Sequence, residues 1–100
     1  MSLRRFDGSN FNFWKEQMQD YLIVKGQIDP IENEVAPEIY KANEWQKLDR
    51  VLRATIRMHL SESVYFIMQS CETAFELWKK LSETYEKKVV STKMYLIRRL

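Results

Sequence analysis

Residues 45–60, WQKLDRVLRATIRMHL, carry the apolar pattern that indicates the fold class of this chain. On a helix at about 100° per residue, one side collects Trp45, Leu48, Leu52, Ile56 and Leu60. Three more residues widen that side to roughly half the circumference, namely Val51, Thr55 and His59. A helix that is apolar over so wide an arc needs several neighbours to cover it. We therefore expect residues 45–60 at the centre of a small helical bundle.

The composition agrees with a single helical domain. The chain has 100 residues, of which 45% are hydrophobic and 13% aromatic, enough for one core. It has only two glycines and two prolines, all before Glu38, and this favours helices over a β fold with many turns. We expect an all-α bundle of about five helices that spans residues 1–100 as one domain.

Charge and hydropathy exclude several classes of protein. The formal net charge is +2 with 30% charged residues, so charge alone indicates neither a nucleic acid nor a membrane as partner. No apolar run reaches about 18 residues, and Asp7 and Gly8 interrupt the start before a signal peptide could form. A single cysteine, Cys71, forms no internal disulfide and suits a reducing interior. We expect a cytoplasmic chain without a membrane partner.

The segment before residue 27 predicts a first helix. Five residues share one face: Phe11, Trp14, Met18, Tyr21 and Leu22. Either Ser9 or Asn10 can cap the helix with a side-chain oxygen, and Gly26 is placed to end it in the left-handed conformation. Residues 27–37 then read as an acidic loop with a turn at Asp29-Pro30.

Four more helices follow from capping and spacing. The central helix begins between Pro37 and Glu44 and ends near Leu60. Ser61 caps a short helix whose inward residues are Val64, Ile67 and Met68.

A capping box, Thr73-x-x-Glu76, starts the next helix. Its apolar stripe comprises Ala74, Leu77, Trp78, Leu81 and Tyr85. A last helix opens at Ser91 or Thr92 and is cut in mid-pattern at Leu100, which predicts a fragment of a longer protein.

Four blocks of residues then form a recognisable series. The first is Phe6-x-Gly8-x-Asn10-Phe11-x-x-Trp14, followed by Met18 and Leu22; the second comprises Trp45, Asp49, Ala54, Ile56 and Leu60. The third is Thr73-Ala74-x-Glu76-x-Trp78-x-x-Leu81-x-x-x-Tyr85, and the fourth is Lys93-x-x-Leu96-x-x-x-Leu100. In this order and spacing the chain resembles the Gag polyproteins of copia-type LTR retrotransposons. Residues 27–38 depart from the apolar continuation that many members show after the first helix.

The resemblance implies a structural protein. Gag of this kind is similar to retroviral capsid, so the resemblance implies a retroviral-capsid-N-terminal-domain-like bundle that self-associates into a virus-like particle around the element's RNA. The implied partner is the chain itself, including a dimer formed through the C-terminal helix, with weak and non-specific contact to RNA. The alternative is a domesticated host adaptor that binds a peptide or helix in a groove between its helices.

A basic stripe on the central helix is the candidate surface for RNA. It comprises Lys47, Arg50, Arg53 and Arg57. The alternative is a solvated face in which Asp49 pairs with Arg53, and the stripe lacks aromatic residues that could stack on bases.

A second candidate surface would mediate self-association. It comprises the apolar residues that the helical patterns leave over: Phe13, Ile23, Val24 and Phe75. They form an interface only if the fold brings them together.

We expect no enzyme activity, cofactor or metal. His59 is the only histidine and lies on an apolar arc, so it reads as a core or boundary residue. Cys71 likewise reads as a small buried residue. The chain has no phosphate-binding loop and no nucleophile motif.

Overall fold

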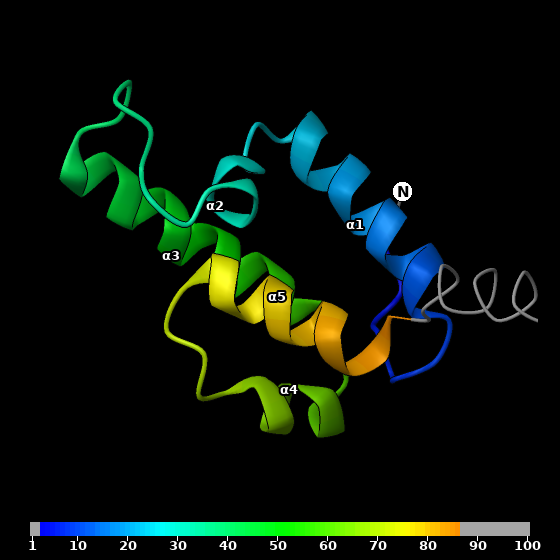
Figure 1. Cartoon of the computed structure of the whole chain (residues 1–100). Coiled ribbons are helices and arrows are strands. Elements are labelled where there is room, and N and C mark those ends of the chain that lie inside the picture. Colours follow the sequence, from blue (N-terminus) through cyan, green and yellow to red (C-terminus); the bar gives the residue numbers. More distant parts are fainter. Residues whose placement is uncertain (1–2, 87–100) are drawn as a thin grey trace, which may run out of the picture.

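Five helices account for the regular structure of the chain between residues 3 and 86, the part that the computed structural model describes (Figure 1). They are α1 (Phe11–Val24), α2 (Asp29–Glu32), α3 (Ala42–Met58), α4 (Glu62–Met68) and α5 (Ala74–Tyr85). The predicted all-α fold is confirmed. The predicted last helix, from Ser91 or Thr92 onward, lies outside the described residues.

The central element of the bundle is α5 rather than α3. Helix α5 contacts α2, α3 and α4, and its Trp78 ring lies 5.9 Å from the Trp14 ring of α1. The apolar stripe predicted for this helix is buried at Ala74, Leu77, Trp78 and Leu81, and Tyr85 packs against the same core.

The prediction that α3 is covered over half its circumference is wrong. Within α3 only Leu52 and Ile56 are buried, and Val51 is 40% exposed. The reason is that α2 and α5 contact α3 while its first turns extend beyond the start of α5 (Figure 1). The boundaries predicted for this helix are confirmed.

The N-terminal segment before α1 enters the core through Phe6. Its backbone N–H donates to the His59 carbonyl at 2.8 Å, and its carbonyl accepts from the Ser61 N–H at 2.8 Å. The Phe6 ring is fully buried, 4.9 Å from the Tyr85 ring and 5.1 Å from the Trp14 ring between centroids. One residue therefore joins the segment to α1, α5 and the α3–α4 junction.

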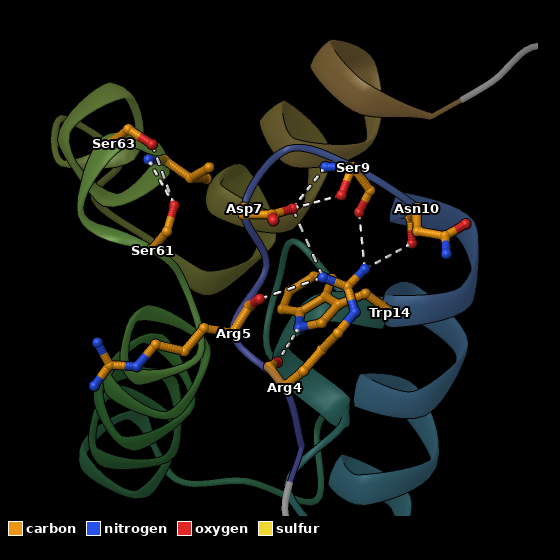
Figure 2. A network of polar contacts seen from close by, with 9 residues as sticks. Arg4, Arg5, Asp7, Ser9, Asn10, Trp14, Ser61 and Ser63 are labelled. Atoms are coloured by element: carbon orange, nitrogen blue, oxygen red, sulfur yellow. Dashed lines mark hydrogen bonds and ion pairs between the residues drawn. The ribbon is translucent and has the colours of Figure 1, made fainter.

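A polar turn connects Phe6 to α1 (Figure 2). Asn10 is the N-cap residue, as predicted, but no side-chain oxygen caps α1. Asn10 has a φ of 57° in the left-handed region, whereas a capping side chain needs an extended backbone at that position. The Arg4 guanidinium instead donates to the Ser9 and Asn10 carbonyls at 2.8 and 3.1 Å, and Asp7 accepts from the Ser9 N–H and hydroxyl.

The C-terminal end of α1 follows the prediction. Gly26 has a φ of 68°, its N–H donates to the Ile23 carbonyl at 3.0 Å, and the Gln27 N–H donates to the Leu22 carbonyl at 2.8 Å. This pair of bonds is the Schellman arrangement, in which the left-handed residue turns the chain away from the helix axis.

The segment predicted as a loop contains α2. This one-turn helix buries Pro30 and Ile31, so the prediction of an acidic, solvated loop over residues 27–37 is wrong at α2. In α4 the cap is confirmed, since Ser61 Oγ accepts from the backbone N–H of Val64. Ile67, predicted to point inward, is 50% exposed, because so short a helix turns only Val64 and Met68 toward the core.

The capping box at α5 is confirmed in one of its two hydrogen bonds. Thr73 Oγ1 accepts from the Glu76 N–H at 3.1 Å. The Glu76 carboxylate, however, accepts from the Glu72 N–H at 3.4 Å rather than from the Thr73 N–H.

Truncation of Phe6 should destabilise the whole fold. We expect Phe6→Ala to lower the free energy of unfolding by about 3–5 kcal/mol, because removal of the ring leaves a cavity between α1 and α5. The matched control is Phe66→Ala, whose ring is 71% exposed and which should change stability by less than about 0.5 kcal/mol. Urea unfolding followed by circular dichroism measures both. Equal small losses in the two variants would contradict the role of Phe6 as a clamp, that is, as the residue that joins the N-terminal segment to α1, α5 and the α3–α4 junction.

Candidate interaction surfaces

A groove of about 470 Å³ runs along the outer side of α1. Its lining, which we call the α1 groove, comprises Leu3, Phe13, Glu16, Gln17, Asp20, Tyr21 and Val24. Phe13 is 53% exposed and Val24 is 84% exposed, so both apolar side chains face solvent. The buried face of α1, at Phe11, Trp14, Met18 and Leu22, is directed toward the core instead.

The four residues predicted for self-association do not form one patch. Phe13 and Val24 both line the α1 groove, about three turns apart on the same side of the helix. Ile23 is 58% exposed but does not line that groove. Phe75 is half-buried and lines a separate groove of about 250 Å³ between α2, α3 and α5, together with Pro30 and Trp45. The structure thus places two of the four residues on one surface.

The α1 groove is acidic at its edge. Glu16 and Asp20 lie one turn apart on α1, and no cationic residue is part of the lining between residues 3 and 86. Neither carboxylate forms an ion pair with another described residue. The groove therefore combines apolar surface with two carboxylates that no cation of the described lining neutralises.

The predicted basic stripe on α3 is divided by its contacts. Lys47 and Arg50 are exposed. Arg53 pairs through Nε with Asp49 at 2.9 Å, and Arg57 donates from Nη2 to the Cys71 carbonyl at 2.8 Å. The predicted pairing of Asp49 with Arg53 is confirmed. Two cations of the stripe thus contact protein groups, and two face solvent.

Asp49 is a structural residue whose second role the sequence analysis missed. Its carboxylate accepts from the backbone N–H of Ala74 at 2.9 Å, so α3 caps the first turn of α5. Asp49 belongs to the second block of the resemblance, but its partner is 25 positions away. No local pattern predicts such a bond.

A further apolar surface on α4 was also missed. Tyr65, Phe66 and Ile67 are 44%, 71% and 50% exposed. The available signal is the run of consecutive apolar residues over 64–68, which is more than one side of a short helix can bury.

His59 and Cys71 occupy the boundary and core positions predicted for them. His59 is half-buried at the C-terminal end of α3, where Nδ1 lies 2.7 Å from the Thr55 carbonyl and the ring lies 5.8 Å from that of Tyr21. Cys71 is 3% exposed, and burial raises the pKa of its thiol. A thiol with a raised pKa is a poor nucleophile at neutral pH.

The described residues contain no cluster of three or more His, Cys, Asp or Glu side chains that could hold a metal ion. Over residues 3–86 no helix combines the length and the apolar character that a bilayer crossing requires.

Comparisons with known proteins identify relatives along most of the sequence. Residues 18–100 match the family described as gag-polypeptide of LTR copia-type. The chain is also 33% identical, over 98 residues and 96% of its length, to the retrovirus-related Pol polyprotein from transposon TNT 1-94 of Nicotiana tabacum. It spans 7% of the length of that polyprotein. No solved structure matches the chain significantly.

The bond between Asp49 and α5 can be tested apart from the ion pair. We expect Asp49→Ala to lower the free energy of unfolding by about 1–2 kcal/mol, because the Ala74 N–H loses its acceptor. Asp49→Asn should lose less, since an amide oxygen still accepts that bond. Glu38→Ala, at an exposed loop position, is the control. Equal losses in the Asn and Ala variants would show that charge, and not the acceptor, stabilises this contact.

Cys71 should be protected from thiol reagents in the folded state. Burial and the raised pKa predict labelling by an aromatic disulfide reagent at pH 8 that is at least about tenfold slower in buffer than in guanidinium chloride. The release of the chromophore measures both rates. Similar rates would mean that the α4–α5 junction opens freely in solution.

Proposed function

Since this chain belongs to the gag-polypeptide family of LTR copia-type elements, by its match over residues 18–100, we propose that it is a structural Gag domain. In this proposal the domain self-associates and contributes to an intracellular virus-like particle that packages the element's RNA. Its helical bundle acts as the N-terminal part of a capsid-like region. The chain is similar over 96% of its length to a tobacco transposon polyprotein. This similarity supports the proposal that the domain is part of a longer protein encoded by the element.

The observation that supports self-association most strongly is the α1 groove. An exposed Phe13 and an exposed Val24 on one side of α1 cost solvation free energy in a monomer and regain it when another surface covers both. The same helix buries its other side completely, so α1 is held rigidly on the domain. A rigid helix with an apolar outer side presents a preorganised contact for another copy.

RNA would contact this domain weakly. Of the basic stripe, Lys47 and Arg50 are free to reach phosphates, while Arg53 and Arg57 contact Asp49 and the Cys71 carbonyl. Two exposed cations attract RNA without sequence preference, and salt weakens that attraction. In this proposal the domain contributes chiefly protein–protein contacts to packaging.

The adaptor alternative would use the groove between α2, α3 and α5. Pro30, Trp45 and Phe75 contribute its apolar surface. At about 250 Å³ it is smaller than the α1 groove, so it would hold only a short part of a peptide. An adaptor of this kind would function as a monomer.

The mass of the chain in solution tests the proposal. We expect light scattering to show an average mass that rises with concentration. Phe13→Ala/Val24→Ala should weaken that association by about tenfold or more, because it removes the apolar contact. The matched control is Val35→Ala/Ile39→Ala, which truncates two loop residues that are 80% and 82% exposed.

A strict monomer at every concentration would contradict the structural role and favour the adaptor. Association that weakens equally in both double variants would contradict the assignment of the interface to α1.

A further inference from the structure

We propose that the α1 groove of one copy receives residues 91–100 of a second copy. The inference rests on the proposed self-association and names the two surfaces that meet. Four features point to this occupant: its charge, the pattern of its apolar residues, its length and the place where α5 ends.

The charges of the two parts are complementary. Residues 87–100 contain five of the 16 basic residues of the chain and none of its 14 acidic residues. Residues 1–86 therefore carry a formal net charge of −3 against +5 for the segment that follows. The α1 groove concentrates part of that negative charge in Glu16 and Asp20. Its apolar surface and its charge both suit a basic amphipathic helix.

The apolar pattern of residues 91–100 contains one cation in its middle. On a helix, Met94, Ile97 and Leu100 share one side, and Lys93 falls between the positions of Ile97 and Leu100. A helix that buries this side also removes the Lys93 ammonium from water, which requires a carboxylate partner. Glu16 and Asp20 lie beside Phe13 and Val24 in the groove and provide one.

The lengths of the two elements also agree. A helix of ten residues is about 15 Å long, and the part of α1 from Phe13 to Val24 rises by about 16 Å. One segment would thus cover the apolar residues at both ends of the groove.

The end of α5 favours a second copy over the same chain as donor. Glu86 follows α5 and pairs with Lys15 of α1 at 2.8 Å. On the helix, Lys15 lies about 160–180° from Phe13, Gln17 and Val24. The chain therefore leaves α5 on the side of α1 opposite to the groove. A segment that docks on the groove of its own copy would have to pass around α1, which the groove of a second copy does not require.

The arrangement makes every copy both donor and acceptor. Two copies that exchange segments reciprocally form a closed dimer, whereas one-way donation forms an open chain of subunits. Only the one-way mode continues to grow from this single pair of surfaces.

A charge exchange between full-length variants tests the proposal. The groove variant is Glu16→Lys/Asp20→Lys, and the segment variant is Lys93→Glu/Arg98→Glu. These variants reverse both carboxylates of the groove and two of the three cations of residues 91–100. The control is Glu38→Lys/Glu83→Lys, which makes the same change in charge at exposed positions outside the groove. Circular dichroism verifies that each variant is folded, and sedimentation velocity measures association.

We expect each reversed variant to associate at least about tenfold more weakly than the parent chain, and the control to associate like the parent. An equimolar mixture of the groove and segment variants should regain association, because the acidic segment of one fits the basic groove of the other.

Three results would overturn the inference. If the parent associates and neither reversal weakens it, the proposed function stands and the docking surface is wrong. If both reversals weaken association but the mixture does not recover, the two surfaces do not meet. If the parent is monomeric at every concentration, the proposed self-association fails and the inference fails with it.

Discussion

The burial of the Phe6 ring is the interaction on which the arrangement of this domain depends. Its backbone is bonded to His59 and Ser61 at the α3–α4 junction, while its ring contacts Trp14 of α1 and Tyr85 of α5. Helix α1 is kept on the bundle by the clamp through Phe6, by the ring contact between Trp14 and Trp78, and by the ring contact between Tyr21 and His59. Two backbone hydrogen bonds and a buried aromatic ring together hold the N-terminal segment in one position.

This clamp has a consequence for the surface of the domain. With Trp14 and its neighbours directed to the core, Phe13 and Val24 must face outward, because they lie on another side of the same helix. Leu3, at the start of the clamped segment, adds a further apolar group to the groove that they line. The constraint that stabilises α1 thereby exposes an apolar and acidic surface, and the proposed role in self-association follows from this exposure.

The sequence alone predicts the features that repeat along a helix and misses those that join distant residues. The stripe of α5, the left-handed Gly26 and the hydroxyl caps at Ser61 and Thr73 are local, and their predictions are confirmed. The partners of Phe6, and the Ala74 N–H that donates to Asp49, lie on other elements, so no spacing reveals them. The width of the apolar arc on α3 overstated its burial, because periodicity shows which side is apolar and not how much of it a neighbour reaches. The same limit explains why Phe13 and Val24 line one groove while Phe75 lines another.

The central claim is that copies of this chain meet at the outer side of α1. A zero-length carbodiimide cross-link tests it most directly, since the reagent joins a carboxylate to an amine only where the two are in contact. Chains labelled with nitrogen-14 and nitrogen-15 would be mixed, cross-linked and digested, and the joined peptides identified by mass. The account predicts links between Asp20 or Glu16 and Lys93 that contain one peptide of each isotope. Associated chains that give no link at these carboxylates, or only links within one isotope, would contradict it.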